Sequence, residues 1–483
     1  MTISAMPLLL LLLVSLSVGS CVGDHHQLLN FMTVKTSSLK HIAEGAVCSG
    51  HKVTMPSGDA VRWVPMNRPH GPCSAAAAAT TVVDGMLLWD QLRTSSIRRK
   101  LSGGRAGDGL PVIHSREAKT SNIDSSMTAK STLGGGGGTS STTMERTSEH
   151  LYSKVSQTVV VDTSSDIPWV QCLPCPAPQC HLQKDQLYDP ANSSTYAPIP
   201  CGSPACTELG SSHSSGCSAG SDQCKYILDY GDGRATAGTY VTDTLTLSPT
   251  IAVKGFRFGC SHAVRGTFSD QTVGVLALGG GAGSLLAQTA ETFGNAFSYC
   301  VPHPSSDGFL SLGGPVGNSS QFASTPLIKN QHAPTFYIVR LEAITVAGRR
   351  LDVPPATFAG GAVMDSGAVV TQLPPSAYAA LRAAFRSAMM AYGPLADPVR
   401  NLDTCYDLTR FPEVNVPKVS LVFAGGATLE LEPASIMLDG CLAFTASPGG
   451  HGSIGFIGNV QQQTYEVLYD VGSGSVGFRS GAC

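Results

Sequence analysis

Short apolar and β-branched runs, separated by Gly, Pro and Ser, fill the chain from about residue 151 to its end. The segments "KYILDYGDGRATAGTYVTDTLTL" and "TFYIVRLEAITVAG" are typical, and this pattern predicts strands joined by turns. One stretch, 374–393, predicts a helix instead, because Tyr378, Leu381, Phe385 and Met389 recur on one face and Gly393 ends the pattern. The sequence therefore predicts a mainly β protein with few helices.

The first 23 residues predict a secretory signal peptide. An apolar run from Leu8 to Val18 is followed by small residues where a signal peptidase would cut. The run is too short to span a membrane, which takes about 20 residues, and no later segment is long and apolar enough. We therefore expect an exported protein without a membrane span.

The cysteines and sequons fit an export route. Of the 15 cysteines, those from Cys172 to Cys483 can form six disulfides, whose pairing the sequence leaves open. The stretch "CLPCPAPQCH" at 172–181 also allows a Cys/His metal site or a redox pair, as a less favoured alternative. Asn192 and Asn318 each begin an "NSS" acceptor sequence and are candidates for glycosylation.

Residues 24–150 differ in composition from the rest. They contain the basic cluster "SSIRRK" at 95–100 and five consecutive glycines at 134–138, which cannot hold regular structure cheaply. We interpret 24–150 as a propeptide and a Gly-rich linker; the alternative is a disordered tail without a regulatory role. The remainder divides into two predicted lobes, 151–332 and 333–483.

Charge and motifs exclude several function classes. The formal net charge is −3 and only 13% of residues are charged, so neither a nucleic-acid partner nor a polybasic membrane anchor is expected. The glycine run lacks the Gly-Lys-Ser/Thr of a phosphate loop, and no HExxH motif occurs. We expect no metal and no cofactor, and a protein or a small molecule as the partner.

Two acidic motifs repeat along the chain. "TVVVDTSSD" places Asp162 after an apolar strand, and "GAVMDSGAV" does the same for Asp365. Each is followed in its own half by an apolar pair and glycine, "VLALGGG" ending at 279–281 and "GFIGN" with Gly458. The simplest account is two similar β lobes, each supplying one aspartate.

A pair of close carboxylates suits peptide hydrolysis. Two such groups cannot both ionise readily, so one stays an acid while the other is a base. The pair can activate a water against a peptide carbonyl and then protonate the leaving nitrogen without a covalent intermediate. The hydroxyls of Thr163 and Ser366 are placed to hydrogen-bond backbone across the interface and fix both turns.

These motifs, with others in the same order, resemble the pepsin-type aspartic peptidases and in detail their nepenthesin-like plant branch. The resemblance covers about 160–483, with propeptide-like segments upstream. It is carried by "DTSSDIPWVQCLPCP", "CKYILDYGDGRATAG", "FRFGCSH", "FSYCV", "VMDSGAVVTQLPPSAYAAL", "LDTCYD" and "FIGNVQQQTYEVLYDVGSGSVGF". It implies a bilobal fold with the active cleft between the lobes.

The resemblance also implies roles for individual residues. Asp162 and Asp365 would be the catalytic dyad, with Tyr230 and Gly231 in a flap over the bound peptide and Trp169 hydrogen-bonded to the tyrosine. The residues that would support the two turns are Thr163, Ser164, Ser366 and Gly367. The cysteines from 172 to 224 would staple an insertion of this branch.

The chain departs from the family pattern at three places. Ser164 and Ala368 stand where glycine and threonine are usual, and we expect the serine to distort its turn. A lead-in strand ending in Gly-Thr-Pro is missing before Asp162, which predicts an open sheet edge beside the cleft.

The prediction for function is a secreted aspartic endopeptidase, made as a zymogen whose basic propeptide blocks the cleft until acid releases it. Protein or peptide substrates, inhibition by pepstatin-type compounds, a monomeric state and an extracellular or vacuolar location are expected. The alternative is a pepsin-fold binding protein with little or no activity, resembling the plant xylanase inhibitors.

Overall fold

The computed structural model describes residues 30–39, 63–67, 81–103, 127–133, 155–209, 216–217, 220–301, 308–314, 321–450 and 452–483. The predicted signal peptide, the five glycines and Asn318 lie outside these residues. Among the helices of the described ranges, none is both long enough and apolar enough for a membrane crossing.

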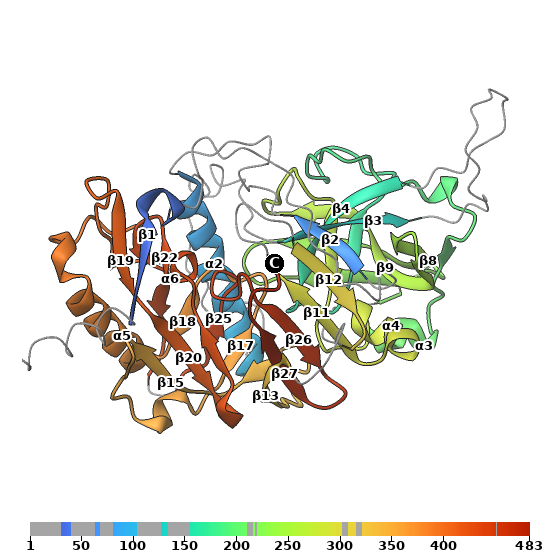
Figure 1. Ribbon diagram of the computed structural model, residues 1–483. Coiled ribbons are helices and arrows are strands. Elements are labelled where there is room, and N and C mark those ends of the chain that lie inside the picture. Colours follow the sequence, from blue (N-terminus) through green and yellow to red (C-terminus); the bar gives the residue numbers. More distant parts are fainter. Residues whose placement is uncertain are drawn as a thin grey trace, which may run out of the picture.

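The chain folds into two lobes of β structure preceded by an N-terminal segment that contacts both, which confirms the mainly β prediction (Figure 1). The N-terminal segment contributes β1 (Phe31–Lys35), η1 (Thr36–Leu39), β2 (Trp63–Asn67), α2 (Thr81–Leu101) and β3 (Thr128–Leu133). The first lobe contains β4 (Val155–Asp162), β5 (Trp169–Gln171), η3 (Pro190–Asn192), β6 (Ala197–Pro198), α3 (Pro204–Glu208), β7 (Lys225–Asp229), β8 (Ala235–Ser248), β9 (Ile251–Arg265), β10 (Gly274–Ala277), α4 (Leu285–Phe293), β11 (Ala296–Cys300), β12 (Gly308–Leu312) and β13 (Ala323–Ile328).

The second lobe contains β14 (Ile338–Val339), β15 (Leu341–Val346), β16 (Arg349–Arg350), η6 (Pro355–Phe358), β17 (Ala362–Met364), β18 (Thr371–Leu373), α5 (Pro375–Ala388), η7 (Met390–Tyr392), β19 (Glu413–Pro417), β20 (Val419–Phe423), η8 (Ala424–Gly426), β21 (Thr428–Glu430), α6 (Pro433–Ile436), β22 (Met437–Leu438), β23 (Cys441–Leu442), β24 (Phe444–Ala446), β25 (Gly455–Ile457), β26 (Glu466–Asp470) and β27 (Ser475–Arg479). The predicted helix is α5, and its apolar stripe is buried as expected.

The repeated motifs occupy matching places in the two lobes. β4 pairs in parallel with β10, and β17 pairs in parallel with β25, so each aspartate strand lies beside the strand that leads to the glycine segment. The loops cross closely there. A Cβ on Gly279 would lie 2.4 Å from Asp166 Oδ1, and one on Gly458 would lie 2.6 Å from the Val369 carbonyl oxygen. Glycine at these two positions is therefore a packing requirement.

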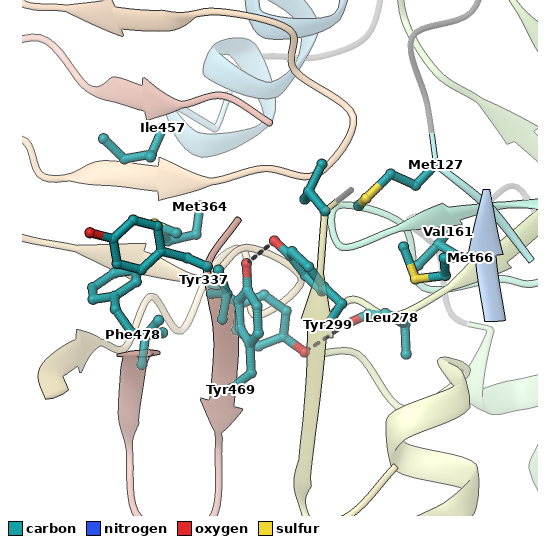
Figure 2. Close-up of a cluster of buried hydrophobic side chains, with 14 of the residues drawn as sticks. Met66, Met127, Val161, Leu278, Tyr299, Tyr337, Met364, Ile457, Tyr469 and Phe478 are labelled. Carbon is teal, nitrogen blue, oxygen red and sulfur yellow. Dashed lines mark hydrogen bonds between the residues drawn. The ribbon is translucent and has the colours of Figure 1, made fainter. Parts of the chain in front are cut away.

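The two lobes share strands and a core. β11 pairs with β26 and β13 pairs with β27, all antiparallel, so the main sheet runs from one lobe into the other. Figure 2 shows the core at this junction, where Tyr299 and Tyr469 join their hydroxyls at 2.8 Å and Tyr337 donates to the Leu278 carbonyl at 2.8 Å. Every one of these buried hydroxyls has a partner, which holds the strands below the two aspartates in fixed positions.

The short lead-in to Asp162 does not leave an open edge, and that prediction was wrong. β3 pairs antiparallel with β4 over its whole length, from Thr128 opposite Val160 to Leu133 opposite Val155. β2 then pairs with both β3 and β12 and completes the sheet. The strand that covers the edge lies just before the glycine run, and its residues, Thr128–Leu133, matched no motif of the family.

Six disulfides form among the described residues, as the cysteine count allowed. The pairs are Cys172–Cys260, Cys175–Cys180, Cys201–Cys217, Cys206–Cys224, Cys300–Cys483 and Cys405–Cys441. The stretch 172–181 therefore holds disulfide cysteines, and the alternative of a metal or redox site there was wrong.

α2 is a 21-residue helix that the sequence did not predict. It lies between the two lobes, drawn in blue in Figure 1, and would be about 30 Å long at 1.5 Å per residue. Buried side chains occur on several of its faces, including the apolar Leu87 and Leu92 and the polar Asp90 and Thr94. A helix enclosed in this way has no single apolar stripe, so periodicity did not reveal it.

Candidate active site

The two aspartate turns meet at the lobe interface. Asp162 ends β4 and Asp365 follows β17, and their exposed fractions are 2% and 0%. Thr163 N–H donates to Ser366 Oγ at 3.1 Å, while Ser366 N–H donates to Thr163 Oγ1 at 3.0 Å. Ser366 Oγ also donates to the Val161 carbonyl at 3.1 Å. These reciprocal bonds hold the two turns in register across the interface.

Backbone N–H groups orient each carboxylate. Ser164 N–H donates to Asp162 Oδ1 at 2.9 Å, and Gly367 N–H donates to Asp365 Oδ1 at 3.0 Å. Asp162 has a further donor, because Ser165 Oγ lies 2.8 Å from its Oδ2. Ala368, at the matching place in the other turn, has no side-chain donor, so the two carboxylates are held unequally.

Ser164 fits its turn without a strained backbone. Four non-glycine residues in the described part of the chain have a positive φ, and Ser164 is not one of them. The cost is its hydroxyl, which is buried and makes no hydrogen bond to any described residue. The expected distortion is therefore limited to an unsatisfied side chain, while the N–H that orients Asp162 is kept.

Replacing Ser164 by glycine is expected to raise the free energy of unfolding by about 1 kcal/mol. Removing an unsatisfied buried hydroxyl gains about 1–3 kcal/mol, and the extra chain entropy of glycine takes back about 0.5–1 kcal/mol. Urea unfolding of the full chain measures this change. A loss of stability would mean that the hydroxyl has a partner in solution.

Arg93 of α2 lies between the two carboxylates. Its Nη2 is 2.6 Å from Asp162 Oδ1 and 2.7 Å from Asp365 Oδ1, and its Nε donates to Asp365 Oδ2 at 2.9 Å. The guanidinium side chain is only 11% exposed. A Cβ at Gly367 would lie 2.5 Å from Arg93 Cζ, so only glycine leaves room for the cation there.

The ion pairs control the titration of this centre. Burial alone would raise the pKa of the Asp162 carboxyl, but the Arg93 cation and the donors of Ser164 and Ser165 outweigh it and hold this pKa below its usual value. Burial likewise lowers the pKa of Arg93, and the charges of Asp162 and Asp365 reverse that and raise it well above its usual value.

The rest of α2 contacts both walls of the site. On the first lobe, Ser96 Oγ donates to the Tyr230 carbonyl and Arg99 Nη2 donates to the Gly231 carbonyl at 2.7 Å. On the second lobe, Asp90 Oδ1 accepts from the Val369 N–H at 2.9 Å. Seated in this way, α2 occupies the space above both aspartates.

Tyr230 and Gly231 lie at the tip of the hairpin between β7 and β8. Trp169 Nε1 donates to the Tyr230 hydroxyl at 2.7 Å, and the indole is completely buried. Burial raises the pKa of Tyr230, so its hydroxyl stays protonated. Gly231 has φ +70°, and Ser96 of α2 packs directly against it. The structure thus brings the predicted flap residues together, on the side of α2 away from the second lobe.

Sequence reasoning missed two residues of this site, Arg93 and Ser165. Arg93 lies just outside the basic cluster at 95–100, and only its charge within the predicted propeptide pointed toward it.

Asn192, a predicted glycosylation site, is exposed in η3, where its Nδ2 donates to Asp189 Oδ2 at 2.8 Å. In the described ranges no group of three His, Cys, Asp or Glu side chains is placed to hold a metal ion.

Sequence models of two families match the chain. The one described as "Xylanase inhibitor N-terminal" covers residues 152–314, and "Xylanase inhibitor C-terminal" covers 336–480. Among solved structures, the basic 7S globulin from soybean matches with a TM-score of 0.55 and 20% identity, over 74% of this chain and 92% of the globulin. At that identity the likeness shows the fold alone, which is the same two-lobed architecture.

Named plant proteases are also similar to this chain. An aspartyl protease family protein of Arabidopsis thaliana is 34% identical over 99% of this chain and 98% of its own length. Aspartic proteinase nepenthesin-2 of Nepenthes gracilis is 33% identical over 68% of this chain and 75% of its own. The chain therefore belongs to the pepsin-type aspartic peptidases, in their nepenthesin-like plant branch.

Proposed function

We propose that this chain is a secreted aspartic endopeptidase made as a zymogen, with Asp162 and Asp365 as its catalytic pair. One observation carries the proposal: a single nitrogen of Arg93 lies within hydrogen-bond distance of both carboxylates. Two buried carboxylates that face one another across one group are arranged for shared protonation, and the cation between them is arranged to prevent it.

The chemistry begins when α2 leaves. Without the guanidinium, the two carboxylates repel each other and bind one proton between them. The ionised carboxylate takes a proton from a water molecule, whose oxygen attacks the carbonyl carbon of a peptide bond. The protonated carboxyl group assists at the carbonyl oxygen, and a proton then passes to the leaving nitrogen. The Tyr230 hairpin covers the bound peptide, with its hydroxyl oriented by Trp169.

Within the N-terminal segment, α2 acts as the block. A substrate needs the surface that α2 covers, and water needs the position of the Arg93 guanidinium. The signal sequence, the six disulfides and the exposed Asn192 support export through an oxidising compartment. The boundaries at 23, 150 and 332 stay predictions.

The opening of α2 is expected to depend on pH through two groups with opposite signs. The pKa of Asp162 is lowered in the closed form, so its ion pair stabilises that form fully above about pH 4, the usual Asp pKa, and is lost as pH falls through the lowered value. Burial raises the pKa of Asp90 to about 7, so protonated Asp90 favours the closed form and this contribution is lost as pH rises toward 7.

Protection of α2 against hydrogen exchange, corrected for intrinsic rates, is therefore expected to be greatest near pH 4–5, a window set by these two directions. It should fall below this window as Asp162 becomes protonated, and fall toward pH 7 as Asp90 ionises. Constant protection from pH 3 to pH 8 would contradict the assignment of these two carboxyls.

The direct test of function is cleavage of denatured globin after acidification of residues 24–483, with and without pepstatin. The proposal expects cleavage that pepstatin suppresses. A folded protein that cleaves nothing from pH 3 to pH 7 would overturn it and would favour the pepsin-fold binder, for which the buried unsatisfied hydroxyl of Ser164 is the supporting observation.

A further inference from the structure

Arg400 lies on the second-lobe wall that α2 covers, some distance from the aspartates. It lies at the tip of a tight turn in which Val399 and Leu402 exchange both backbone hydrogen bonds, at 3.1 and 2.9 Å. Its φ is +51°, and the nearby Cys405–Cys441 disulfide and the fully buried Leu402 anchor the turn. The guanidinium is thus presented from a rigid support.

In the closed form, Arg400 binds a carboxylate of α2. Its Nη2 donates to Asp84 Oδ2 at 2.7 Å, and its Nε is shared between Asp84 Oδ1 at 3.0 Å and the Asp84 carbonyl oxygen at 2.9 Å. This is the two-pronged geometry in which arginine recognises carboxylates. Within the described residues no other acidic group forms an ion pair with Arg400. When α2 leaves, the Arg400 guanidinium therefore loses Asp84, while its turn stays in place.

The surroundings suit an extended peptide. Beside Arg400, the apolar surface that Val83, Met86 and Leu87 of α2 cover is formed by second-lobe residues that include Val369 and Val370. A cavity of about 600 Å³ adjoins α2 on this wall and is lined by Arg400, Asn401, Thr445, Ser447 and Gln372 together with α2 itself. Side chains of a substrate can thus enter this wall between Arg400 and the aspartates.

The distance between Asp84 and Arg93 along α2 gives the distance between Arg400 and the two aspartates. Asp84 precedes Arg93 by nine helical residues, and at 1.5 Å each they lie about 13–14 Å apart along the helix. An extended peptide advances about 3.3 Å per residue, so about four residues cover the same span.

We infer that Arg400 determines specificity in the opened enzyme by binding a Glu or Asp side chain about four residues from the scissile bond. The inference rests on the proposed function, since it concerns the substrate of the same cleft. In the closed form, Asp84 of α2 then occupies the position at which the substrate carboxylate binds. Arg93 in the same way occupies the position between the two aspartates.

The test compares internally quenched peptides that share a neutral core and differ only in Glu or Gln four residues from the scissile bond, on either side. The full chain is first treated with acid to open the cleft and is then assayed at pH 5–6, where Glu is ionised. For one of the two sides, kcat/KM is expected to be about fivefold higher with Glu than with Gln, a size typical of a partly exposed ion pair. The preference should shrink in 0.5 M salt.

The variants are Arg400→Gln, which should bring the Glu-to-Gln ratio to about one, and Arg400→Lys, which should leave an intermediate ratio. Arg410→Gln, an exposed arginine of the same lobe, is the matched control and should keep the wild-type ratio. Because the Glu and Gln peptides are assayed with the same preparation, the ratio of their kcat/KM values does not depend on how much of the protein is active. If Arg400→Gln does not fold, Arg400→Lys decides, since its ratio must then differ from that of the wild type and lie closer to one.

Three outcomes overturn the inference. Equal cleavage of all peptides by the wild type, or a Glu preference that survives Arg400→Gln, contradicts the role of Arg400 and leaves the peptidase assignment intact. No cleavage of any peptide contradicts the proposed function, and the inference falls with it.

Discussion

Asp365→Asn is expected to lower kcat for peptide hydrolysis by about 10²–10⁴-fold, the contribution typical of a general acid or base. The asparagine amide keeps the size of the side chain and can still accept from Gly367, but it cannot exchange a proton with water or with Asp162. The rate is measured on denatured globin with acid-processed protein at pH 3–5.

Asp439→Asn provides the matched control. Asp439 is an exposed residue of the second lobe with φ +51°, a conformation that asparagine tolerates. Its rate should stay within about twofold of the wild type, in keeping with the small effects of surface changes. An Asp365→Asn variant that keeps a tenth of the wild-type rate would show that Asp365 is not one of the reacting groups.

Arg93→Ala is expected to make the full-length chain active at pH 5–6 without prior acid treatment, at least tenfold above the wild type. Removing one partner of a buried ion pair costs about 3–5 kcal/mol, and here two buried carboxylates lose their cation when α2 is seated. The closed form therefore becomes the less populated one. Cleavage of a quenched peptide in the first seconds after mixing measures this before any processing.

Lys100→Ala tests whether any lost positive charge on α2 has the same effect. Lys100 on the same helix forms no ion pair within the described residues, and its charge acts on Asp162 only from a distance, without a contact. Without acid treatment, this variant should cleave the quenched peptide no faster than the wild type does. Equal activation of both variants would mean that general charge attraction, and not the contact of Arg93 with the aspartates, closes the site.

The positions of the aspartates could be predicted because the signal is local. An apolar strand followed by Asp and a hydroxyl residue specifies a strand and a turn, and its repetition specifies two lobes. The glycines at 279 and 458 belong to the same signal, since each is required where two loops cross.

Arg93 and β3 could not be predicted, for a different reason. Arg93 reaches the aspartates only through the placement of a helix whose contacts lie 69 and 272 residues away in sequence. β3 has no motif of its own, and its role depends on pairing with β4 across residues that include the glycine run. Long-range contacts of this kind leave no periodic pattern in a single sequence.

The account depends most directly on a competent pair of aspartates that Arg93 blocks. Calorimetric titration of pepstatin into the full-length chain at pH 5, with the wild type beside Arg93→Ala, measures this without any chemical step. We expect the variant to bind one equivalent and the wild type to bind at least tenfold more weakly, because α2 must first leave. A folded variant that does not bind, or equal binding by both proteins, would contradict the account.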